Sequence, residues 1–224
     1  PSEEALAAAA EGNRLMREFL LEQIAQRKKI PRDDLISQLI ASEINGDRLT
    51  EDEIVSQCAL LLLAGNLTTT DMIGNGVRAL LENPEQLLKL RANPQLIEDA
   101  VEEVLRYDSP VLNSARITHE NTEIQGCPVE KGECLHVSLA AANHDPETYA
   151  NPDTFDIERP RVQHQSFGGG RHHCLGAFLA RLEGQVAILS LVQHFPKLAI
   201  SERGFAQKLA PEFRGMEYCW LTTE

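Results

Sequence analysis

The chain has 224 residues, of which 42% are hydrophobic and 25% are charged, the values of an ordinary globular protein. Its net charge of −13 argues against a nucleic-acid partner, because phosphates demand a basic surface. The longest apolar run, Ala59 to Ala64, is far shorter than the ~18 residues that a membrane span requires.

The cysteine content indicates a reducing compartment. There are five cysteines, and an odd number without a C-x-x-C pair is typical neither of a disulfide framework nor of a zinc site. The first ten residues show no basic region followed by an apolar core, the pattern of a signal peptide. We therefore expect a cytoplasmic protein.

Three helices are predicted in the first part of the chain. Residues 3–29 are rich in helix-forming residues and are followed by Pro31, and residues 32–42 predict a shorter helix. A long helix is predicted from Thr50, a good N-cap followed by an acidic first turn, to about Leu81. Its middle, Leu60 to Leu63, is apolar on every face and is expected to be buried.

The rest of the chain mixes helices with short strands. Pro84 and Pro94 are expected near the starts of two helices that end near Leu90 and Tyr107. Turns and β-forming residues predict a small sheet at residues 109–141, followed by an irregular segment at 143–165. A further helix is predicted at 175–195, and short strands are predicted in the tail beyond 197. Without repeats or linkers, the chain is predicted to be mainly α with a minor β part.

The segment from Phe167 to Gly176 is the most informative in the sequence. Three glycines at 168–170 would let a flat ligand approach the backbone closely. Cys174 stands at the start of a predicted helix, where the N–H groups and the helix dipole favour a thiolate, which is a soft metal ligand. From the residues alone, a flexible loop with a buried cysteine is an alternative. A phosphate loop is less favoured, since no G-K-[ST] follows.

This segment resembles, at every fixed position, the haem loop F-G-x-G-x-H-x-C-x-G of the cytochrome P450 family, and the similarity continues from Ala180 to Glu183. The resemblance implies the P450 fold and haem b, with Cys174 as the thiolate ligand of the iron. It also implies further cofactor-binding residues in the loop, namely Phe167, Gly168, His172 and Gly176.

Two other segments resemble family motifs around the haem. Glu103 to Arg106 matches E-x-x-R, whose ends lie on one helix face. The resemblance implies that Arg159 completes a structural network with Glu103 and Arg106. It also implies that Arg116 pairs with a haem propionate and that His172 lies near the other, since a guanidinium can donate two parallel hydrogen bonds to a carboxylate.

The segment from Ala64 to Thr69 resembles the family's A-G-x-[DE]-T-T motif in the long helix. Gly65 and Asn66 would then lie beside dioxygen, and Thr68 would hydrogen-bond it and help to deliver protons. Leu67 departs from the motif, because the family usually has an acid there. Asp71 lies one turn later, where it can face the same side or the solvent.

The resemblance implies a monooxygenase that uses dioxygen, a small organic substrate and a ferredoxin- or flavodoxin-type electron donor. The substrate pocket is expected to be largely apolar, with Leu63, Val111, Leu112, Asn113 and Phe213 in its wall. Leu67 leaves open a haem-thiolate reductase or peroxygenase.

A fragment that is not competent alone is a further alternative. Residues 1–224 resemble only the carboxy-terminal part of a single P450 domain, so the amino-terminal half or a second chain is expected to cover the haem.

Overall fold

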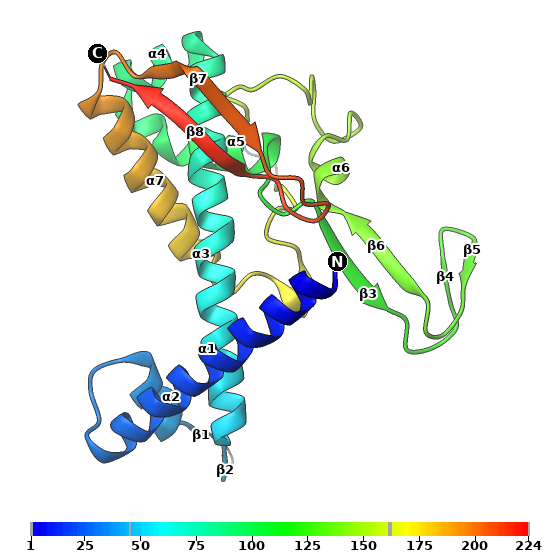
Figure 1. Ribbon diagram of the computed structural model, residues 1–224. Helices are drawn as coiled ribbons and strands as arrows, with labels where there is room; N and C mark the ends of the chain where they lie inside the picture. The colour runs from blue at the N-terminus through cyan, green and yellow to red at the C-terminus, as the bar shows by residue number, and fades with distance from the viewer. Residues whose placement is uncertain (1, 45, 161–162, 224) are drawn as a thin grey trace. The chain divides into compact units, whose positions relative to one another are not determined.

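The computed structural model describes residues 2–44, 46–160 and 163–223. The chain divides into two compact units, Pro1–Asn66 and Leu67–Glu224. Helix α3 (Glu51–Glu82) contributes its first half to one unit and its second half to the other (Figure 1). The predicted irregular segment includes residues 161–162, which lie outside the described residues.

The first unit is a small helical cluster. It contains α1 (Glu3–Lys29), α2 (Leu35–Ala41), the short strands β1 (Glu43–Ile44) and β2 (Asp47–Arg48), and the start of α3. The start of α3 is a capping box, because Thr50 Oγ1 accepts from Glu53 N at 3.3 Å and Glu53 Oε2 accepts from Thr50 N at 2.7 Å. Its core is formed by Leu20, Ile24, Ile54, Val55 and Cys58.

The middle of α3 is not buried as its composition predicts. Leu60, Leu62 and Leu63 are 59%, 51% and 61% exposed. This expectation was wrong because burial needs a partner on every face, and an apolar segment does not reveal whether its partner belongs to the same chain.

The second unit holds the larger core. It is built by the second half of α3, α4 (Pro84–Ala92), the 3₁₀ turn η1 (Pro94–Leu96), α5 (Ile97–Tyr107) and α7 (Ala177–His194). The helices pack closely at glycines: a Cβ on Gly76 would lie 2.7 Å from Ile188 Cδ1, and one on Gly184 would lie 2.7 Å from Met72 Cε. A Cβ on Gly76 would also lie 3.1 Å from Val104 Cγ2 of α5, so both α5 and α7 pack against α3.

The strands of the described residues form two-stranded antiparallel pairs. In the second unit, β3 (Asn113–Ile117) pairs with β6 (Cys134–Ser138), β4 (Thr122–Ile124) with β5 (Cys127–Val129), and β7 (Ala199–Gln207) with β8 (Met216–Thr222). The short helix α6 (Leu139–Asn143), capped by Ser138, was not predicted. The prediction of a mainly α fold with a minor β part is confirmed.

No helix in the described part of the chain is both long enough and apolar enough to cross a membrane.

Candidate functional site

The Phe167–Gly176 segment folds as a tight loop ahead of α7. Cys174 N donates to Phe167 O at 3.0 Å, and Gly168 N donates to Gln165 O at 2.8 Å. Gly168 and Gly170 adopt φ of 65° and 64°, the left-handed region in which a side chain is disfavoured. The loop therefore presents Cys174 at a fixed point before the first turn of α7.

The surface beside Cys174 is open and apolar. Cys174 is exposed, and Leu175 and Phe178 are each 86% exposed. A Cβ on Gly169, Gly170 or Gly176 would meet no heavy atom of the described chain within 4 Å. A soft sulfur donor beside an apolar surface, with glycines that leave room for close approach to the backbone, fits a planar group such as haem.

The base of the loop is fastened to α5 by two side chains. Ser166 Oγ donates to Leu105 O at 2.6 Å, and His164 Nε2 lies 3.2 Å from Glu102 Oε2. Arg181 of α7 makes a two-pronged contact with Glu102, at 2.5 Å and 3.0 Å. Burial of Glu102 opposes its ionisation, but the hydrogen bonds from His164 and Arg181 outweigh it and lower the Glu102 pKa to about 2.

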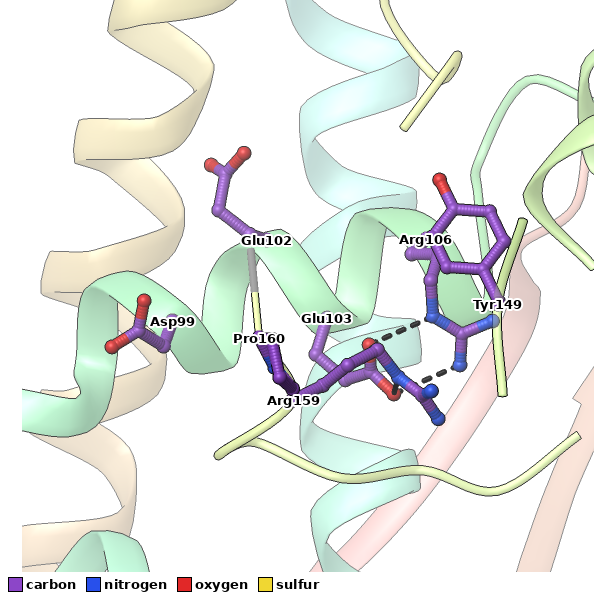
Figure 2. A pocket seen from close by; sticks show the side chains of 7 residues that line it. All are labelled: Asp99, Glu102, Glu103, Arg106, Tyr149, Arg159 and Pro160. Carbon is purple, nitrogen blue, oxygen red and sulfur yellow. Dashed lines mark hydrogen bonds and ion pairs between the residues drawn. The ribbon is translucent and has the colours of Figure 1, made fainter. Parts of the chain in front are cut away.

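The structure brings Glu103, Arg106 and Arg159 together. Arg106 donates to both carboxylate oxygens of Glu103 at 2.8 Å, and Arg159 Nε lies 3.2 Å from each of them. Figure 2 shows the Glu103 carboxylate beside both guanidinium groups, with Glu102 turned away from them. Glu103 and Arg106 are buried, so the network is internal to the fold.

Both arginines also tie the irregular segment to α5. Arg106 donates to Asn143 O and Pro152 O, and Arg159 donates to Thr154 O. The shallow pocket of Figure 2 lies next to this network. Cys174 and the loop glycines do not line that pocket, so it is separate from the predicted haem site.

The two predicted propionate residues both lie at the surface. Arg116 is exposed on β3, where its guanidinium donates to Ser114 Oγ and Ala115 O at 2.7 Å. His172 is exposed in the 3₁₀ turn η2 (Gly170–His172) of the loop.

The predicted oxygen-binding segment spans the division between the two units. Leu63, Gly65 and Asn66 lie in the first unit, whereas Leu67 and the half-buried Thr68 lie in the second. Leu67 is 41% exposed.

Asp71 does not face solvent, which was one of the two expectations for it. It is 2% exposed and pairs with Lys208 at 2.6 Å. Its Oδ2 is buried and has no hydrogen-bond partner among the residues that the structure describes. The carboxyl group lies against Gly215, because a Cβ there would overlap it. Asp71 thus fastens the β7–β8 connection to α3.

Four of the five predicted pocket residues lie together. Val111 and Phe213 form an isolated antiparallel bridge, and Leu112 N donates to Glu212 O at 2.9 Å. Asn113 Nδ2 donates to Pro211 O at 3.1 Å. The chain after α5 and the β7–β8 connection therefore form one surface.

The sequence did not indicate that Glu102 and His164 fasten the cysteine loop, or that Lys208 pairs with Asp71. Arg181 falls within the Ala180–Glu183 similarity but received no role. The only available signal was the position of Glu102 beside Glu103, and it does not identify a partner 79 residues away.

Comparisons with known proteins agree on one family. The model of the cytochrome P450 family matches residues 4–211. The biotin biosynthesis cytochrome P450 of Bacillus subtilis is 46% identical over 206 residues, covering 92% of this chain and 52% of the relative. The polyketide biosynthesis cytochrome P450 PksS of the same species is 39% identical and covers 95% of this chain and 55% of the relative.

Solved structures give the same result for the fold. P450BioI, solved in complex with a hexadec-9Z-enoic acid-ligated acyl carrier protein, is similar with a TM-score of 0.95 and 43% identity, covering 100% of this chain and 57% of that chain. CYP109E1 of Bacillus megaterium, solved in complex with testosterone, is similar with a TM-score of 0.94 and 31% identity. The match covers 99% of this chain and 62% of that chain.

The chain spans about half the length of the relatives that it matches. The family match covers most of the chain, and P450 structures superpose on all of it, including the cysteine loop and the helices around it. Members of this family bind haem b and are generally haem-thiolate monooxygenases. The chain belongs to the cytochrome P450 family.

Proposed function

We propose that the protein acts as a haem-thiolate monooxygenase, with Cys174 as the ligand of the iron. The observation that carries this proposal is the loop from Phe167 to Gly176, which presents an exposed sulfur before α7 and beside an open apolar surface. When bound, haem supplies the oxygen-activating chemistry, and the protein supplies the ligand, the pocket and the protons.

The other residues around the loop would hold the cofactor's edges and the reacting molecule. Phe167, Gly168 and Gly176 shape the cysteine loop, and Arg116 and His172 are suited to bind the propionates as cationic or hydrogen-bonding groups. Thr68, with Gly65 and Asn66, is proposed to bind dioxygen and to hold a proton for it at the hydroxyl oxygen.

The proposed substrate is a mainly apolar organic molecule. The surface formed by Val111, Leu112, Asn113 and Phe213 supports this, because it joins apolar side chains with one amide. P450BioI and CYP109E1 were solved with a long-chain acyl group on a carrier protein and with a steroid, both largely apolar. One oxygen atom of dioxygen would enter the substrate and the other would leave as water, with electrons from a ferredoxin- or flavodoxin-type donor.

Reductase or peroxygenase chemistry is a second candidate, favoured by Leu67. An exposed apolar side chain stands where the motif has an acid, and Asp71 is engaged by Lys208. A reaction that needs no protonation of dioxygen would be less affected by this change than a monooxygenase reaction.

The cytoplasm is the proposed compartment. All five cysteines, each within the described ranges, are unpaired thiols. Free thiols persist in a reducing compartment.

The test of the proposed function is the absorption spectrum of the reduced, carbon-monoxide-bound holoprotein. The wild type is expected to show the long-wavelength Soret band of a thiolate ligand, and Cys174→Ala or Cys174→His is expected to lose it. Cys134→Ala, a change at an exposed cysteine on β6, is the matched control and is expected to keep the band. A thiolate band that survives Cys174→Ala would contradict the proposal.

A further inference from the structure

Consecutive glutamates on α5 serve two different parts of the molecule. Glu103 engages Arg106 and Arg159 and so holds the irregular segment. Glu102 turns away from that network (Figure 2) and engages Arg181 and His164. Its side chain is 28% exposed, so it stands between the interior and the surface.

Arg181 connects Glu102 to the cysteine loop. Its guanidinium lies over the Phe167 ring, with the central carbon 4.6 Å from the ring centroid. A cation at this distance is attracted to the face of an aromatic ring. Phe167 in turn accepts a hydrogen bond from Cys174 N through its carbonyl oxygen. The contacts therefore run from Glu102 through Arg181 and Phe167 to the backbone of the proposed ligand.

His164 joins the same cluster from the other end of the loop. Its Nδ1 accepts from Ser166 N at 3.2 Å, so the proton resides on Nε2, which points to Glu102 Oε2. The His164 ring also lies 5.8 Å from the Phe167 ring, measured between centroids. Phe167 is thus flanked by His164 and by Arg181, and both are held by one carboxylate.

We propose that Glu102, Arg181 and His164 form a brace that positions Phe167 and, through it, the Cys174 thiolate. They are positioning residues, because their action on the sulfur passes through Phe167. The Glu102 carboxylate has a second role, since it balances the positive charge that Arg181 places beside the loop. This inference rests on the proposed function, in which Cys174 binds haem iron.

The charge argument predicts opposite shifts from opposite changes. In Glu102→Gln the Arg181 charge remains without its counterion, which stabilises the more electron-rich ferrous state and raises the haem reduction potential. In Arg181→Gln the cation is lost and the Glu102 charge remains, so the potential falls. A merely structural effect, in which water reaches a loosened site, would shift both variants in the same direction.

The experiment measures the haem reduction potential and the reduced carbon-monoxide spectrum of the holoprotein for each variant. Glu102→Gln and Arg181→Gln are expected to shift the potential in opposite directions. They are also expected to increase the share of the short-wavelength Soret band that a neutral thiol gives. Glu102→Asp keeps the charge and is expected to restore most of the wild-type spectrum.

The matched control is Glu158→Gln, which removes the same charge from an exposed pair with Lys89. It is expected to change neither readout. If a Gln variant does not load haem, the spectrum of Arg181→Lys is measured in its place. This variant keeps the positive charge but loses the two-pronged contact with Glu102, so it is expected to increase the share of the short-wavelength Soret band. Wild-type potential and spectrum in both Gln variants, or shifts of the same sign, would overturn the brace. Loss of the thiolate band in the wild type itself would instead refute the proposed function.

Discussion

At the scale of single residues, Glu103 is a buried carboxylate that pairs with two arginines. It is 4% exposed and faces Arg106 and Arg159, which are 2% and 12% exposed. Removing one partner of a buried ion pair costs about 3–5 kcal/mol, because the remaining charge is left unpaired. The role of this cluster is therefore proposed to be structural rather than catalytic.

We expect Glu103→Ala to lower the free energy of unfolding by about 3–5 kcal/mol and to reduce the yield of haem-loaded protein. Denaturant unfolding and the ratio of haem to protein measure this. Glu158→Gln is the control, since exposed pairs contribute about 0–1 kcal/mol. A Glu103→Ala protein as stable as the control would show that the network does not hold the fold.

Glu102 predicts a dependence of stability on pH. Its pKa lies at about 2 in the folded protein against an ordinary value of 4.5. Because the folded-state pKa is depressed, the extra stability is present above pH 4.5 and is lost as the pH falls toward 2. The difference in unfolding free energy between wild type and Glu102→Gln should therefore shrink through that window. A difference that stays constant with pH would contradict the assignment.

At the scale of elements, the β7–β8 connection is seated directly on α3. Gly215 leaves room for the Asp71 carboxyl group, and a Cβ would overlap it. Lys208 pairs with the same carboxylate, and Asn75 Nδ2 donates to Arg214 O at 3.0 Å. This connection carries Phe213, so its attachment to α3 also sets one wall of the proposed substrate surface.

We expect Gly215→Ala to destabilise the protein by about 1–3 kcal/mol, the usual cost of overpacking. Gly12→Ala is the control: no heavy atom of the described chain lies within 4 Å of its Cβ position in α1, and the change should gain up to about 1 kcal/mol of helix propensity. Thermal unfolding measures both. In the double variant with Asp71→Ala, the cost of Gly215→Ala should fall, because the overlap is removed. Additive costs would contradict the contact.

At the scale of the whole molecule, α7 presents an apolar stripe that the described chain leaves uncovered. Its members recur at the spacing of one helix face. They are Phe178 (86% exposed), Leu179 (60%), Leu182 (56%) and Val186 (59%), and Leu175 (86%), two residues before α7, extends the exposed apolar surface. Soluble monomers rarely expose a surface of this kind. The relatives are about twice as long as this chain. We propose that a segment corresponding to the rest of their length, or a second chain, covers this surface.

We expect a polypeptide of residues 1–224 alone to self-associate and to couple electron flow poorly to oxygen insertion, because an open haem face admits water. Light scattering and the ratio of product to electrons consumed measure these two properties. Tightly coupled hydroxylation by a monomer of this length would contradict the expectation.

The role of Leu67 is tested in the haem-loaded protein by the ratio of product to electrons consumed. Leu67→Asp is expected to improve coupling if the proton supply limits the reaction. An unchanged ratio of product to electrons consumed would show that Leu67 does not limit the proton supply.

The sequence alone determined the features that depend on neighbours along the chain. Thr50 and Glu53 cap each other across one turn, and Pro84 lies at the first position of α4, so helix bounds followed from local chemistry. The loop from Phe167 to Gly176 was recognisable because its glycines and its cysteine act within ten residues. The grouping of Glu103 with Arg159 came from resemblance, since 56 residues separate them.

Only the tertiary structure decided which distant side chains meet. Glu102 reaches Arg181 across 79 residues, and Asp71 reaches Lys208 across 137. Such pairs depend on how helices and loops pack, and no local pattern encodes them. The same reason explains the error at Leu60 to Leu63: composition reports that a surface is apolar, whereas burial depends on which partner packs against it.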